Sequence, residues 1–200
     1  MAVSTVIKKN NIWLVFALVY CWKVLLLAIS AQPVPSNDAF FYDGPVVNYL
    51  QNGGYFNPSL VMALPISSTE VFCAYPPLYQ AVLLGWMTIF GTTALSAMVM
   101  HLVLFGVYML ILLAIFRRLQ TPAWCVNIAG AFLLLITFHD RPDSLAYVLG
   151  MASVYAWICS RKMLGGERSG AHSAFWTWMM VVFVILCLAT SLQIGAIYFF

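Results

Sequence analysis

Long apolar stretches alternate with short polar ones along most of this 200-residue chain. Five stretches have 16 to 24 residues each, close to the roughly 20 that a helix needs to cross the hydrocarbon core of a bilayer. They cover residues 12–31, 93–116, 122–138, 145–160 and 175–198. The pattern predicts an all-α fold, a polytopic transmembrane helical bundle with about five spanning helices.

A sixth apolar stretch, residues 76–91, corresponds to only about 24 Å of helix, which is short for a core of about 30 Å. If this stretch does not cross, Arg117 and Arg118 lie on the same side as Lys8 and Lys9. Because cytoplasmic loops are enriched in basic residues, we expect a half-buried juxtamembrane helix over 77–90 and a cytoplasmic N-terminus.

Composition agrees with an integral membrane protein, since 64% of residues are hydrophobic and 8% are charged, against about a quarter charged in soluble domains. The net charge of +3 is accounted for by the basic loops on one side, which argues against a nucleic-acid partner. We expect one domain over residues 1–200, and the apolar C-terminal end suggests a fragment of a longer protein.

The first loop on the outer side, residues 32–75, contains Asn37-Asp38-Ala39-Phe40-Phe41-Tyr42-Asp43 and a short amphipathic pattern over 41–51. A carboxylate at the membrane face can accept a proton from a hydroxyl or coordinate a divalent ion. Asp38 can equally cap the helix that follows it. Both interpretations stay open.

Tyr75-Pro76-Pro77-Leu78-Tyr79 connects this loop to the short apolar stretch. The doubled proline keeps the residues before it extended and allows Pro77 to begin a helix. By itself the motif predicts no more than a helix start.

The second outside loop, residues 139–144, carries His139-Asp140-Arg141-Pro142-Asp143. Charged groups beside a membrane are costly unless they pair or meet a polar ligand. One interpretation is a self-paired loop in which Asp143 caps the next helix. The other is a ligand site in which Arg141 provides bidentate phosphate geometry.

Taken in order, these motifs together with Gly53-Gly54-Tyr55-Phe56-Asn57-Pro58 resemble the amino-terminal part of C-type, multi-membrane-spanning glycosyltransferases. The likeness covers roughly residues 12–150. Within that group the chain is most similar to the bacterial branch related to protein O-mannosyltransferases and to the transferases that add aminoarabinose to lipid A.

The resemblance implies an enzyme that transfers a sugar, with inversion, from a polyprenyl-phosphate donor to a lipid, glycan or protein acceptor. Asp38 would be the general base, and Asp143, or less favourably Asp140, the second acidic residue. Arg141 would steady the lipid phosphate. The tyrosines of these motifs would contact the substrate, namely Tyr42, Tyr75 and Tyr79.

The chain departs from the family pattern at Asp38-Ala39, where many relatives have two acidic residues, and at Tyr75, where many have histidine. A divalent metal ion therefore remains possible as a cofactor but is not assigned. The alternatives are a transporter or channel subunit and a non-catalytic membrane assembly protein. Lys23 and His101 lie inside apolar stretches, and we interpret both mainly as packing residues that face other helices.

Overall fold

A computed structural model describes residues 11–29, 37–57, 77–135, 142–161 and 170–191, and every regular element within these ranges is a helix. The helices are α1 Asn11–Ile29, α2 Asn37–Asn52, α3 Leu78–Phe90, α4 Ala94–Arg118, α5 Ala123–Leu135, α6 Asp143–Ser160 and α7 Gly170–Leu188. The expected all-α class is therefore confirmed.

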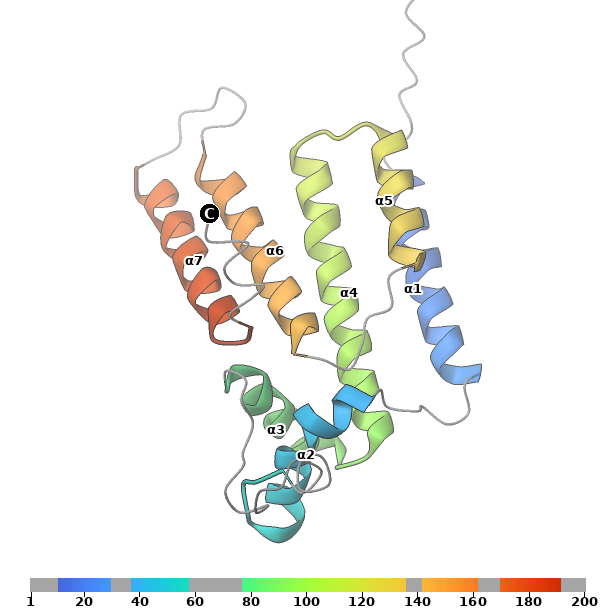
Figure 1. Ribbon diagram of the computed structural model, residues 1–200. Coiled ribbons are helices and arrows are strands. Elements are labelled where there is room, and N and C mark those ends of the chain that lie inside the picture. The colour runs from blue at the N-terminus through green and yellow to red at the C-terminus, as the bar shows by residue number, and fades with distance from the viewer. Residues whose placement is uncertain (1–10, 30–36, 58–76, 136–141, 162–169, 192–200) are drawn as a thin grey trace, which may run out of the picture.

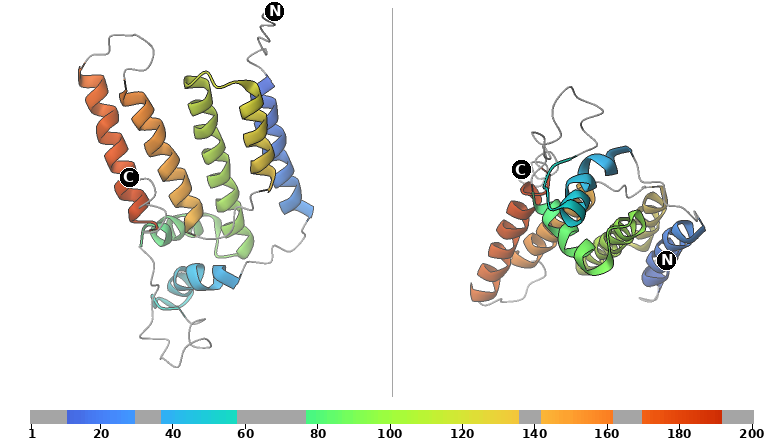
Figure 2. Two further views of the ribbon diagram at one scale, coloured as in Figure 1. Left: turned by 45° about the horizontal axis from the view of Figure 1, so that its top comes forward. Right: turned by 90° about the horizontal axis from the view of Figure 1, so that it is seen from below.

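The long bundle is formed by helices that lie side by side, namely α1, α4, α5, α6 and α7, and α2 and α3 lie together at one end of it (Figure 1). Helix α6 packs against α4 and α7, and α1 packs against α4 and α5. Figure 2 shows the same order from two further directions. Helices α1, α5 and α7 run toward the end occupied by α2 and α3, whereas α4 and α6 run away from it (Figure 1).

Within the described ranges, two helices are long and apolar enough to cross a membrane, namely Ala94–Arg118 and Ala171–Leu188. The apolar parts of α1 and α5 are shorter, at Trp13–Ile29 and Ala123–Leu134. These two helices are therefore candidate membrane spans by length and composition, and the expectation of about five spanning helices stays a prediction.

Large apolar side chains project outward from the two long apolar helices, α4 and α7. On α4, Leu110 is 58% exposed, and on α7, Trp178 is 70% exposed. Exposed apolar surface of this extent marks contact with a partner or a membrane. A membrane location agrees with this surface.

The start of α3 follows the expected proline elbow, because Pro77 directly precedes Leu78, the first helical residue. The Leu78 amide also donates to the Ala189 carbonyl at 3.2 Å, which ties α3 to the end of α7. At the start of α4, the Thr93 hydroxyl accepts from the Ser96 amide at 3.1 Å.

Two helix boundaries differ from the prediction. Helix α2 begins at Asn37 instead of residue 41 and continues through Pro45. Helix α7 occupies Gly170–Leu188 instead of 175–198. Its end is closed by turn hydrogen bonds, in which the amides of Thr190 and Ser191 both donate to the Cys187 carbonyl.

The described interior contains three apolar clusters, the smallest of which joins Ala146 of α6 to Cys187 of α7. A second joins α2, α3, α4 and α6 and includes Val46, Leu83 and Met100. The third joins α1, α4 and α5 and includes Phe105. At its edge the Lys23 ammonium donates to the Leu134 carbonyl at 3.0 Å, so Lys23 faces a neighbouring helix as expected.

Candidate functional site

A chain of buried polar side chains connects four helices where α2 and α3 meet the bundle. The Tyr79 hydroxyl of α3 donates to Asp43 Oδ1 of α2 at 2.9 Å. The same hydroxyl oxygen lies 3.1 Å from His101 Nε2 of α4. His101 Nδ1 lies 2.7 Å from the Ser144 Oγ of α6. We call these four residues the buried relay.

The directions of these hydrogen bonds follow from the number of protons available. Tyrosine has one hydroxyl proton, and Tyr79 uses it toward Asp43. For a neutral imidazole this assignment places the proton on His101 Nε2, which donates to the Tyr79 oxygen. Nδ1 is then an acceptor for the Ser144 hydroxyl proton. In this tautomer all three bonds point toward the Asp43 carboxylate.

Burial makes this arrangement energetically important. Tyr79 is fully buried, His101 and Ser144 are each 3% exposed, and Asp43 is 9% exposed. The Tyr79 and His101 rings are also stacked, with centroids 5.9 Å apart. A buried polar group without a partner costs about 1 to 3 kcal/mol, so the relay stabilises one relative placement of its four helices.

A second polar contact lies one residue further along α3. The Tyr55 hydroxyl donates to Gln80 Oε1, which fastens the segment after α2 to α3. Gln80 is 4% exposed, and its Nε2 has no hydrogen-bond partner within the part of the chain that the structure describes. The Nε2 atom is enclosed by protein in this conformation, so a ligand at the surface does not reach it.

The turn that brings Tyr55 to α3 is formed by Asn52-Gly53-Gly54. Helix α2 ends at Asn52, and Gly53 adopts φ +75°, a left-handed conformation that glycine tolerates best. Asn48 Nδ2 then donates to the Gly54 carbonyl at 2.6 Å. The Gly-Gly motif thus has a local structural role beside any role in a site.

Asp38 and Asp143, the two acidic residues expected to be catalytic, lie in helices at this end of the molecule. The backbone of Asp38 is in the first turn of α2. Asp143 is the first residue of α6, half-buried and adjacent to Ser144 of the relay. The structure therefore brings the first outside loop and the start of α6 together through Asp43 and Ser144.

The capping alternative for Asp143 is wrong, because the residue before α6 is Pro142 and no side chain caps that helix. Asp38 lies in the first turn of α2, one residue after Asn37, and its capping alternative stays a prediction. A carboxylate in a first turn is instead favoured by the helix dipole.

Tyr42 and Tyr79, two of the expected substrate contacts, lie in the interior at 7% and 0% exposure. In this conformation both side chains pack in the interior beneath the site and do not form its surface. The other expected contacts, Tyr75, Asp140 and Arg141, lie outside the described residues.

The sequence alone did not identify Asp43, His101 and Ser144 as members of one cluster. The available signal was an ionisable His101 inside an apolar stretch, which is costly unless it has a partner. Among the described residues, no group of three His, Cys, Asp or Glu side chains could hold a metal ion. A divalent metal ion therefore stays unassigned as a cofactor.

Comparisons with models of known protein families, with curated proteins and with solved structures find no match for this chain.

Proposed function

We propose that this protein is a membrane glycosyltransferase that moves a sugar from a polyprenyl phosphate to an acceptor at the outer face of the inner membrane. The observation that carries the proposal is the buried relay, because it joins the two loops on which the acidic motifs lie. Asp43 is five residues from Asp38 along α2, about 7.5 Å at the helical rise. Ser144 directly follows Asp143.

In the proposed reaction, Asp38 accepts the proton of the acceptor hydroxyl as its oxygen bonds to the anomeric carbon. The bond from that carbon to the phosphate oxygen breaks, and its electron pair leaves with the lipid phosphate. Attack from the face opposite the phosphate inverts the anomeric centre. Arg141 stabilises the charge that grows on the leaving phosphate, as cations do at developing oxyanions.

The relay contributes positioning to this mechanism. It fixes α2 relative to the start of α6, so that Asp38 and Asp143 are presented from rigid helices at the same end of the bundle. Such a preorganised set of polar groups lowers the reorganisation needed during reaction.

The test is transfer of labelled sugar by membranes containing the full-length protein, with polyprenyl-phosphate mannose and polyprenyl-phosphate aminoarabinose as donors. Asp38→Asn should lower transfer by about 10² to 10⁴-fold, the usual contribution of a general base. Glu167→Gln is the matched control, since it makes the same carboxylate-to-amide change on the predicted cytoplasmic side.

Undiminished transfer by Asp38→Asn at normal protein abundance would overturn the assignment of the base. If the wild-type protein transfers neither sugar and is recovered in a stoichiometric membrane complex, the assembly-protein alternative is favoured.

A further inference from the structure

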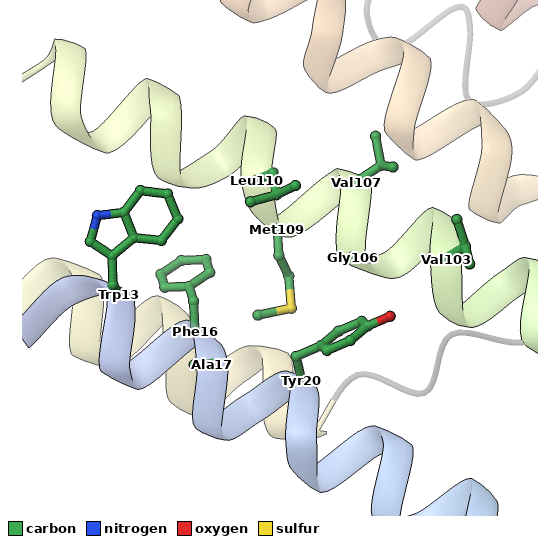
Figure 3. A pocket seen from close by; sticks show the side chains of 9 residues that line it. All are labelled: Trp13, Phe16, Ala17, Tyr20, Val103, Gly106, Val107, Met109 and Leu110. Carbon is green, nitrogen blue, oxygen red and sulfur yellow. The ribbon is translucent and has the colours of Figure 1, made fainter.

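An apolar groove of about 440 Å³ runs between α1 and α4, on the far side of α4 from the buried relay. Figure 3 shows Trp13, Phe16 and Tyr20 of α1 extending toward Met109 of α4 across this space. The groove residues lie within eight positions on each helix, from Trp13 to Tyr20 and from Val103 to Leu110. The seven residue steps between the first and the last correspond to about 10 Å along a helix.

The floor and the rim of the groove differ in exposure. Phe16 and Met109 are each 4% exposed and form the floor, whereas Trp13 and Leu110 are 42% and 58% exposed and form part of the rim. A groove with this apolar lining accepts a hydrocarbon chain lying along the helices.

Gly106 allows Tyr20 to lie close to the backbone of α4. A Cβ atom at Gly106 would be 3.0 Å from the Tyr20 ring, closer than ordinary van der Waals contact. The glycine therefore sets the depth of the groove at its Tyr20 end.

A cation lies at the opposite end. The Arg117 guanidinium is 4.7 Å from the centroid of the Trp13 ring, which itself lines the groove. Arg117 is exposed. A guanidinium stacked on an indole keeps its edge N–H groups available, and these match the oxygens of a phosphate. The groove thus has an apolar body and an anion-binding end.

We propose that this groove binds one acyl chain of an anionic phospholipid whose phosphate contacts Arg117. The inference rests on the proposed membrane location but not on sugar transfer. Arg117 lies in the last turn of α4, at the end of the molecule away from α2 and α3 (Figure 1). A sugar donor bound with its phosphate at Arg117 would hold its sugar far from Asp43 and Asp143, which favours a structural phospholipid over the donor.

The experiment measures lipid retained by the full-length protein after transfer from phosphatidylcholine nanodiscs containing a minority of phosphatidylglycerol, using native mass spectrometry. The wild-type protein should retain one phosphatidylglycerol. Arg117→Gln should lower that retention by about tenfold, the effect of one lost charge-assisted contact. Arg117→Lys should lower it less, because lysine keeps the charge but not the fork.

Two control variants separate the groove from general charge and hydrophobicity. Arg161 lies 5.3 Å from the Trp157 ring and, among the described lining residues, is not part of the groove, so Arg161→Gln should retain lipid normally. Ala17→Leu fills the groove and should abolish retention. Ala28→Leu, at an exposed site further along α1, should not.

Equal retention of phosphatidylcholine and phosphatidylglycerol would overturn the proposal. So would normal retention in Ala17→Leu, a second copy of the chain on this face, or a polyprenyl phosphate recovered in place of the phospholipid. Sugar transfer lost without any change in retained lipid would count against the proposed function alone.

Discussion

At the scale of single residues, the Tyr79 hydroxyl joins α2 to the helical bundle. It contacts Asp43 of α2 and His101 of α4 at 2.9 and 3.1 Å. Both partners are almost completely buried, so water cannot easily replace a lost protein contact. The hydroxyl therefore contributes more to stability than one at the surface would.

Tyr79→Phe should lower the free energy of unfolding by roughly 2 kcal/mol or more, because two buried groups each lose a hydrogen bond. Thermal unfolding in detergent, followed by circular dichroism, measures the effect. Tyr49→Phe is the control, since Tyr49 is 45% exposed on the same α2 and keeps its ring contact with Tyr55. Equal melting temperatures for the two variants would contradict the importance of the relay.

At the scale of elements, α3 is fastened at both ends. Its first amide bonds the carbonyl of Ala189, and the Trp86 indole donates to the Ser96 carbonyl at 2.9 Å. The tight connection from α3 to α4 depends on Thr93, whose hydroxyl caps α4. The Thr93 cap and the Trp86 indole therefore bond the same residue in the first turn of α4, namely Ser96.

Thr93→Ala should destabilise the protein by about 1 kcal/mol, the usual effect of removing a threonine cap. Hydrogen–deuterium exchange should become faster in peptides that cover the start of α4. Thr93→Ser keeps the capping oxygen and should exchange as the wild type does, and Thr92→Ala should also have little effect. Faster exchange in the serine variant would show that the cap is not the cause.

At the scale of the whole molecule, the two ends of the bundle differ in charge. Arg117, Arg118 and Arg161 lie at the ends of α4 and α6, whereas Asp43 and Asp143 lie near the opposite end with α2 and α3 (Figure 1). Since basic residues favour the cytoplasmic side, the charge separation predicts which end faces outward.

Cysteine labelling tests this orientation in a Cys73→Ser background. Asn52→Cys, at the exposed end of α2, should react with a membrane-impermeant maleimide on intact spheroplasts. Leu119→Cys, at a residue that is 43% exposed after α4, should react only after the membrane is opened. Labelling of both sites from outside would contradict the orientation.

The prediction of helices from sequence succeeded where the signal was local. The expected 93–116 stretch became Ala94–Arg118, and the proline elbow placed the start of α3 at Leu78. It failed for α7, whose end lies ten residues earlier than expected. Hydropathy continues past Leu188, but a turn there is held by hydrogen bonds and by docking of α3 on Ala189, neither of which a hydropathy pattern contains.

The sequence by itself determined the all-helical class, the order of the apolar segments and the separation of acidic from basic ends, because these depend on composition over short stretches. Only the tertiary structure decided that Asp43, Tyr79, His101 and Ser144 meet. The contacting pairs are 36, 22 and 43 residues apart along the chain. Whether such residues touch depends on how each helix is rotated against its neighbours, and that rotation is set by packing of all the helices at once.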